Sequence, residues 1–222
     1  MSGIVLLPTL TCYWIKDRAM TTSPEKILFL PGASGDIAFW HPAAAAIRTS
    51  AIVRHMGWPG FGNEPAKPNV ACLQHLAALA LGEVDRPTAL VAQSMGGVVA
   101  MLLALERPEL ITHLVLSVTS GGLDLSAFAA ADWRAEFEAQ NPRLPRWFLD
   151  DRTDLTARLS ELGMPVLLLW GDADPISPVA VGECLMQLIP NASLEVFADA
   201  GHDLGHSHAA AVARLIDAHL AS

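Results

Sequence analysis

The sequence predicts an open, doubly wound α/β domain, in which a mostly parallel sheet lies between two layers of helices. Short apolar runs alternate along the chain with longer segments of helical periodicity. The runs at residues 89–91 and 166–169 are apolar at every position, which is typical of strands covered on both faces. Hydrophobic residues make up 52% of the 222 positions, so a large interior is available.

The expected elements follow one another in regular alternation. Strands are predicted at residues 26–31, 51–55, 88–93, 113–118, 165–170 and 193–197. Helices are predicted at residues 70–82, 96–107, 178–188 and 207–220. The second helix should end at Arg107, because Pro108 disfavours helical backbone in the residue before it.

Residues 121–162 break this alternation. Two of their aromatic residues, Trp133 and Phe137, are four positions apart, as on one face of a helix. We expect this segment to be a short cap insertion within a single domain of residues 1–222, since no repeat, low-complexity tract or linker indicates a second one. The aromatic side chains either line a substrate pocket or anchor the insertion on the core; they are Phe128, Trp133, Phe137, Trp147 and Phe148.

Charge and apolar patterning exclude several classes of partner. With 14 Lys and Arg against 23 Asp and Glu, the net charge is -9, so no basic surface is expected to attract nucleic acid or anionic lipid. No uninterrupted apolar run reaches the roughly 18 residues needed to span a bilayer. The apolar residues 4–10 lack a basic flank and a cleavage site, so we expect them in the mature protein.

The cysteines indicate a reducing compartment. Cys12, Cys72 and Cys184 are odd in number and far apart, which predicts neither a disulfide framework nor a zinc site. We therefore expect a cytoplasmic protein, and the sequence leaves its oligomeric state open.

The strongest chemical motif is Leu90-Val91-Ala92-Gln93-Ser94-Met95-Gly96-Gly97, an apolar strand that passes through a serine directly into a helix. This is the pattern of a nucleophile elbow, in which small neighbours allow strand and helix to approach closely. Ala92 occupies a position that is usually glycine in this pattern, and it differs from glycine by one methyl group. The alternative is that Ser94 merely caps the following helix.

A glycine-containing loop follows the first strand, at Pro31-Gly32-Ala33-Ser34-Gly35. In acyl transfer, negative charge develops on the carbonyl oxygen, and backbone N–H groups aimed at it stabilise the transition state. The amides of Ala33 and Met95 are the candidates for this oxyanion hole. The loop could instead be an ordinary turn; a phosphate loop is disfavoured because no Gly-Lys-Ser/Thr ending follows.

Two aspartates lie just beyond the predicted strand at residues 165–170. Asp174, three residues after Gly171, is the candidate acid that orients a histidine, whereas Asp172 is expected to organise the turn through its own backbone.

His202 follows the last predicted strand and is the candidate general base. His206, His208 and Asp203 are close enough in sequence for a metal site to be considered, but Gly205 interrupts the stretch and no partner cluster is found. We predict no metal or cofactor, and treat His206 and His208 as polar residues at a helix start.

Serine, aspartate and histidine in this order, each after its own predicted strand, resemble the α/β-hydrolase superfamily over residues 26–220. The stretch Gly57-Trp58-Pro59-Gly60-Phe61-Gly62 is similar to a segment that flanks the active site in that family. The resemblance implies an α/β-hydrolase fold with a mostly parallel central sheet. Because only about 25 residues precede the first strand, we expect a trimmed front edge of the sheet.

By the same resemblance, Ser94 would be acylated by a small carboxylic ester or thioester carrying an apolar acyl or aryl group, with His202 as base and Asp174 orienting it. Alternatives that use the same residues are a carbon–carbon bond hydrolase, a lyase or synthase, and a non-catalytic ligand-binding protein. Serine at position 94 disfavours dehalogenase and epoxide hydrolase activity, which use an aspartate nucleophile.

Overall fold

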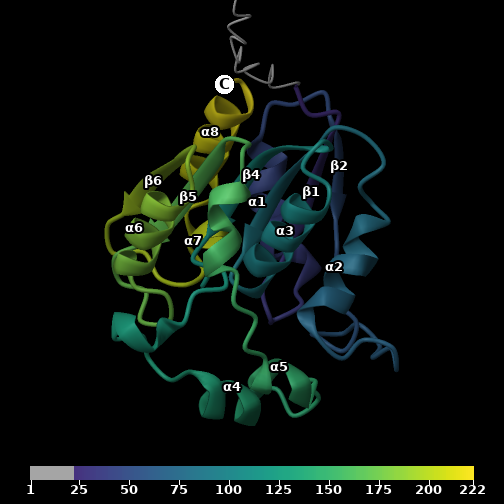
Figure 1. Cartoon of the computed structure of the whole chain (residues 1–222), viewed down its shortest axis with the longest axis vertical. Coiled ribbons are helices and arrows are strands. Elements are labelled where there is room, and N and C mark those ends of the chain that lie inside the picture. Colours follow the sequence, from purple (N-terminus) through teal and green to yellow (C-terminus); the bar gives the residue numbers. More distant parts are fainter. Residues whose placement is uncertain (1–22) are drawn as a thin grey trace, which may run out of the picture.

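The computed structural model describes residues 23–222. Its centre is a six-stranded sheet, all parallel, in the order β2-β1-β3-β4-β5-β6 (Figure 1). The six predicted strands are confirmed, with ends shifted by no more than two residues: β1 (Lys26–Leu30), β2 (Ile52–His55), β3 (Thr88–Gln93), β4 (Ile111–Ser117), β5 (Val166–Gly171) and β6 (Ala192–Phe197).

Burial along the strands follows their place in the sheet. The four inner strands, β1, β3, β4 and β5, are buried at every residue, as expected for strands with helices on both faces. The edge strands β2 and β6 contain only exposed and half-buried residues, in strict alternation in β2. The fully apolar runs in β3 and β5 are therefore explained by their inner position.

Helices cover both faces of the sheet. Figure 1 shows α2 (Leu73–Leu81), α3 (Met95–Glu106) and α6 (Val179–Leu188) in front, with α1 (His41–Ala46) and α8 (Ala209–Leu220) behind. The predicted helix at residues 207–220 is divided into α7 (Leu204–Ser207) and α8, with His208 at the junction. The sequence did not predict α1, because six residues are too few to show a periodicity.

The segment at residues 121–162 leaves the sheet after β4 and returns at β5. It contains two short helices, α4 (Arg134–Gln140) and α5 (Arg146–Asp150), and two 3-10 turns, η2 (Leu125–Phe128) and η3 (Thr156–Glu161). In Figure 1, α4 and α5 lie beyond the carboxyl ends of the strands. The rings of Trp133 and Phe137 are in contact with centroids 5.6 Å apart, which confirms that they share one helix face.

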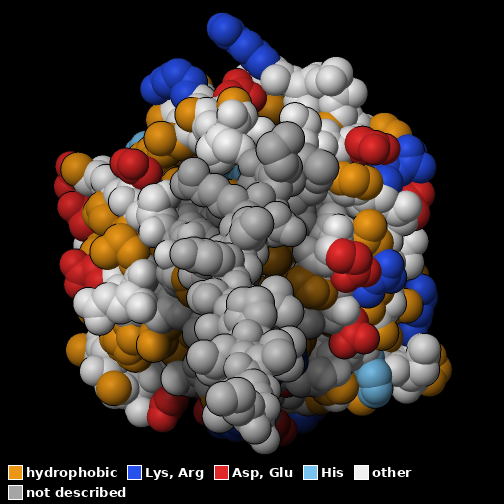
Figure 2. Space-filling model, turned by 45° about the horizontal axis from the view of Figure 1, so that its top comes forward, with side chains coloured by type: hydrophobic (Ala, Val, Ile, Leu, Met, Phe, Trp, Pro, Cys, Tyr) orange, Lys and Arg blue, Asp and Glu red, His pale blue; other side chains and the backbone are white. Residues whose placement is uncertain are grey.

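The amino ends of the strands form the opposite end of the molecule. Figure 2 shows acidic, basic and hydrophobic side chains of the described residues interspersed at that end. Within residues 23–222, no helix is long and apolar enough to cross a membrane, and Cys72 and Cys184 are free thiols. Cys12, the apolar residues 4–10 and the expected front edge of the sheet fall outside the described residues.

Candidate active site

The turn between β3 and α3 carries Ser94 in a strained conformation. Its φ of 52° and ψ of -121° are rare for a residue with a side chain. The helix packs tightly against the neighbouring loop, since a Cβ atom on Gly96 would overlap the carbonyl oxygen of Pro31. Ala92 is fully buried in β3, where its methyl group is accommodated. The strand and helix predicted on either side of Ser94 are both present.

Three of the predicted site residues are joined by hydrogen bonds. The Ser94 Oγ atom lies 3.0 Å from His202 Nε2, and His202 Nδ1 lies 2.7 Å from Asp174 Oδ2. Because a carboxylate only accepts hydrogen bonds, Nδ1 carries the ring proton and Nε2 is left to accept the serine proton. This arrangement has the tautomer that a general base at Nε2 requires.

The two aspartates after β5 have different surroundings. Asp174 is 4% exposed, and its Oδ1 atom accepts hydrogen bonds from the Ile176 and Ser177 amides at 2.8 and 3.3 Å. Asp172 is exposed and accepts a 2.7 Å hydrogen bond from the amide of Asp199. Asp172 thus stabilises a neighbouring turn rather than its own, which differs from the expectation and arises because β6 returns beside β5.

Two tryptophans hold the loop that contains Ala33. Trp40 donates to the carbonyl of Leu30 at 3.1 Å and Trp58 to that of Pro31 at 2.8 Å, both from buried rings. Ala33 and Met95 both line the cavity that contains Ser94. Neither amide N–H has an acceptor within the described part of the chain. Both are therefore free to donate to a bound group.

A cavity of about 940 Å³ opens above Ser94. Its floor includes Ser94, Met95 and His202, and its roof comes from the segment at residues 121–162. Trp133, Phe137 and Phe148 line it, and their rings contact one another in T-shaped or tilted arrangements. Phe61, from the Gly57–Gly62 stretch, contacts the edge of this group at Phe148. The five aromatic residues are thus divided between the two roles that the sequence left open: Trp133 and Phe137 line the cavity, Phe128 and Trp147 pack against the core, and Phe148 does both.

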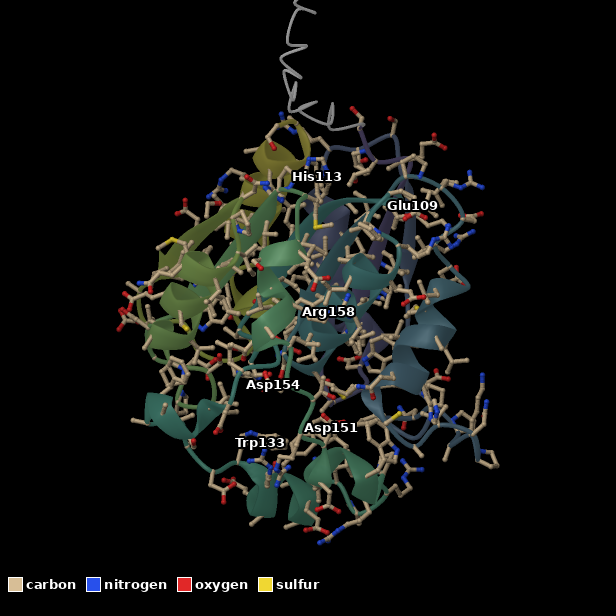
Figure 3. All side chains as sticks on the ribbon, viewed as in Figure 1. Glu109, His113, Trp133, Asp151, Asp154 and Arg158 are labelled. Atoms are coloured by element: carbon tan, nitrogen blue, oxygen red, sulfur yellow. The ribbon has the colours of Figure 1, made fainter. Side chains whose placement is uncertain are left out.

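The wall of this cavity is acidic. Among residues 23–222, five aspartates line it, together with two arginines, Arg134 and Arg152; the aspartates are Asp124, Asp132, Asp151, Asp154 and Asp203. Figure 3 shows Trp133, Asp151 and Asp154 between the end of the sheet and the α4–α5 segment. Hydrogen bonds from Ser126 lower the pKa of Asp124, and those from Thr156 lower the pKa of Asp154, so both are ionised at neutral pH.

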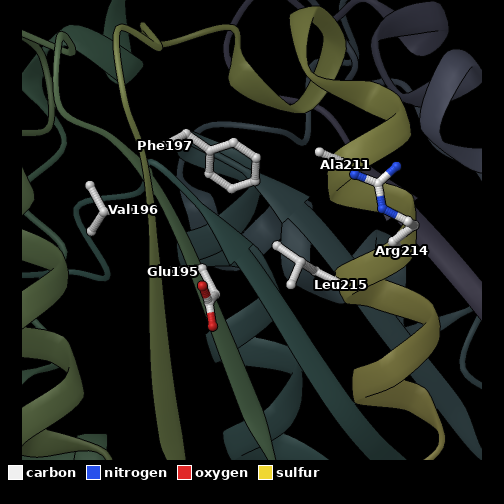
Figure 4. Close-up of a pocket in the computed structure, with 6 residues that line it drawn as sticks. All are labelled: Glu195, Val196, Phe197, Ala211, Arg214 and Leu215. Atoms are coloured by element: carbon white, nitrogen blue, oxygen red, sulfur yellow. The ribbon is translucent and has the colours of Figure 1, made fainter.

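The remaining histidines lie away from this cavity. His206 lies in α7 and its Nδ1 donates to the Phe39 carbonyl oxygen at 3.1 Å, and His208 stands directly before α8, at the start of that helix. In residues 23–222, no three His, Cys, Asp or Glu side chains are grouped to hold a metal ion. A second cavity of about 310 Å³ lies between β6 and α8 (Figure 4) and contains none of the predicted site residues.

Three polar residues around the site were missed from the sequence. Gln93 donates to the His202 carbonyl at 3.1 Å, Thr119 donates to the Ser94 carbonyl at 2.7 Å, and Ser177 donates to the Thr119 carbonyl at 3.1 Å. Gln93 could have been found by its place next to Ser94. Thr119 and Ser177 have no motif of their own, and only the sheet order brings them to Ser94.

Comparison with known families identifies the fold family. The profile described as "Alpha/beta hydrolase family" matches residues 27–160, and that described as "alpha/beta hydrolase fold" matches residues 145–209. The chain belongs to the alpha/beta hydrolase family. The first match alone covers more than half of this α/β hydrolase and includes β1, β3 and the Ser94 turn.

Individual relatives are distant. The α/β hydrolase is 28% identical over 224 residues to the dihydrolipoyllysine-residue acetyltransferase component of an acetoin cleaving system from Cupriavidus necator, covering 80% of this chain but only 59% of that protein. It is 22% identical to a pimeloyl-[acyl-carrier protein] methyl ester esterase from Neisseria meningitidis, with 89% and 94% covered. A hydrolase structure from Pseudomonas aeruginosa matches with a TM-score of 0.71 at 23% identity, covering 90% and 91%, which supports the fold.

Proposed function

We propose that this α/β hydrolase is a serine hydrolase that cleaves a small carboxylic ester or thioester through an acyl-enzyme at Ser94. The observation that carries the proposal is the hydrogen-bonded series Asp174, His202 and Ser94 at the floor of the 940 Å³ cavity. A nucleophile, a base in the required tautomer and a buried acid are the groups that acyl transfer needs. The esterase named among the relatives is consistent with this reaction class.

The reaction would proceed in two halves. Ser94 Oγ attacks the acyl carbon while His202 Nε2 takes its proton, and the resulting oxyanion receives hydrogen bonds from the Ala33 and Met95 amides. When the tetrahedral intermediate collapses, the bond to the leaving oxygen or sulfur breaks and His202 returns the proton to it. Water then attacks the acyl-enzyme with His202 as base, which releases the acid and restores Ser94.

The lining of the cavity supports a particular range of substrates. The rings of Trp133, Phe137 and Phe148 offer an apolar surface for an acyl or aryl group. Because five aspartates outnumber two arginines in the same wall, an anionic substrate would be repelled. We therefore propose an uncharged ester or thioester, covered by residues 121–162 acting as a cap.

The first experiment treats the full chain with a fluorophosphonate and locates the adduct by peptide mass spectrometry. We expect labelling of Ser94, and turnover of p-nitrophenyl esters that depends on acyl chain length. Ser94→Ala should abolish both. If Ser94→Ala hydrolyses every accepted ester as fast as the wild type, the proposed nucleophile is wrong; labelling of Ser94 without ester turnover would favour the carbon–carbon bond hydrolase.

A further inference from the structure

The peptide group that joins Ser94 to Met95 is held from below by Thr119. The Thr119 hydroxyl donates to the Ser94 carbonyl oxygen at 2.7 Å, and the Gly97 amide donates to the same oxygen at 2.9 Å. In a planar trans peptide, the C=O and N–H bonds point in opposite directions. The two hydrogen bonds that fix the Ser94 carbonyl therefore also fix the direction of the Met95 N–H, the donor proposed for the oxyanion.

Thr119 is itself held in one orientation. It is fully buried, and its Oγ1 atom accepts a 3.1 Å hydrogen bond from the Gly121 amide. Since Oγ1 already accepts from Gly121 and the Ser94 carbonyl can only accept, the hydroxyl proton points at Ser94. A Cβ atom on Gly97 would lie 2.6 Å from Thr119 Oγ1, so this close approach requires glycine at position 97.

The backbone before Thr119 is strained. Val118 is buried and has a φ of 43°, a conformation that β-branched residues rarely adopt. Such strain costs about 1 to 3 kcal/mol and persists only where the surrounding structure enforces it. Ser94, at φ 52°, is strained in the same way at the end of the adjacent strand. The two strained residues together bring the Thr119 hydroxyl under the Ser94 turn.

Thr119 also connects this turn to the acid. Its carbonyl accepts a 3.1 Å hydrogen bond from the buried Ser177 hydroxyl, and the Ser177 amide donates to Asp174 Oδ1 at 3.3 Å. Asp174 bonds to His202, and His202 bonds to Ser94. The hydrogen bonds thus form a closed ring that links the segments following β3, β4, β5 and β6.

We infer that Thr119 is a positioning residue of the reaction, which aims the Met95 N–H at the oxyanion and ties the Ser94 turn to the Asp174 turn through Ser177. This inference rests on the proposed function. Thr119 is not among the residues that line the cavity. It acts through the Ser94–Met95 peptide, whose N–H also becomes a stronger donor because its carbonyl accepts two hydrogen bonds.

The test compares two Thr→Val substitutions in the full chain. Thr119→Val removes the hydroxyl at nearly constant shape, and Thr112→Val is the matched control, because Thr112 is buried in β4 and its Oγ1 has no partner among the described residues. Thr119→Val loses the hydrogen bond from Thr119 to the Ser94 carbonyl, which aims the Met95 N–H at the oxyanion. Loss of one hydrogen bond's contribution to the transition state should lower kcat about five- to tenfold. KM should stay within about twofold, as expected for a group that acts only in the transition state.

Further variants separate positioning from stability. Thr119→Ser keeps the hydroxyl and should restore kcat to within about twofold of wild type. Ser177→Ala breaks the same ring, so its effect combined with Thr119→Val should be less than the product of the two. The rate of fluorophosphonate labelling should fall in parallel with kcat in Thr119→Val, and melting temperatures measured on all variants report the loss of stability separately.

The outcomes of the inference and of the proposed function are distinct. Equal kcat in Thr119→Val and Thr112→Val, or a change in KM alone, would overturn the positioning role while Ser94→Ala still abolished activity. If the Ser94→Ala variant hydrolysed esters as fast as the wild type, the proposed function itself would be overturned. If Thr119→Val does not fold, Ser177→Ala decides the matter, and wild-type kcat in that variant would count against the ring.

Discussion

Replacing Asp174 by asparagine tests the proposed acid with little change of shape. The Oδ1 atom of Asp174 accepts from the Ile176 and Ser177 amides, and an asparagine carbonyl oxygen can keep both hydrogen bonds. The Oδ2 atom, 2.7 Å from His202 Nδ1, would become an NH₂ donor. His202 must then accept at Nδ1 and carry its proton on Nε2, where it faces Ser94 and cannot act as a base.

We therefore expect Asp174→Asn to lower kcat by about 10⁴-fold, the cost of a wrong tautomer in a site of this kind. Asp172→Asn is the matched control, since Asp172 is exposed and an asparagine oxygen still accepts from the Asp199 amide. The assay is hydrolysis of a p-nitrophenyl ester, with thermal melting to verify folding. Retention of kcat within tenfold in Asp174→Asn, or a larger loss in Asp172→Asn, would refute this assignment of the acid.

Other predictions concern the cavity and the response to acid. Because the cavity wall is acidic, the p-nitrophenyl ester of butyrate should have a kcat/KM at least about tenfold above that of the succinate analogue, which carries a carboxylate. The double variant Asp124→Asn, Asp154→Asn should reduce this ratio of kcat/KM values, and the reduction should be largest at low salt. Trp133→Ala should raise KM more for esters with an aromatic acyl group than for acetate esters. If the Trp133 ring only anchored the cap, the substitution would lower the stability of the protein and leave the ratio of the two KM values unchanged. Burial lowers the pKa of His219 to about 4, so the unfolded chain binds a proton between pH 6.5 and 4 that the folded chain does not. The free energy of unfolding should thus fall by about 3 kcal/mol as the pH falls through that window. Urea denaturation of His219→Gln should show a smaller fall, and an equal fall would contradict the argument.

Much of the fold is predictable because the inner strands contain uninterrupted apolar runs that are visible in the sequence. Residues 89–91 and 166–169 are apolar throughout, since β3 and β5 are covered on both faces, and this alone indicates a parallel sheet between helices. Short elements such as α1 and the break at His208 leave no comparable pattern, because four to six residues are less than two helical turns.

The sequence by itself determined the fold class and the five candidate site residues, because Ser94, Met95, Ala33, Asp174 and His202 each follow a recognisable apolar strand. Their mutual distances, the acidic wall of the cavity and the ring through Thr119 and Ser177 were decided only by the tertiary structure. Asp172 and Asp174 are the same residue type two positions apart, so the sequence hardly distinguishes them. In the structure they differ in burial and in the hydrogen-bond partner of each carboxylate. Hydrogen bonds between strand ends depend on which strands are neighbours, and that order is a property of the folded sheet.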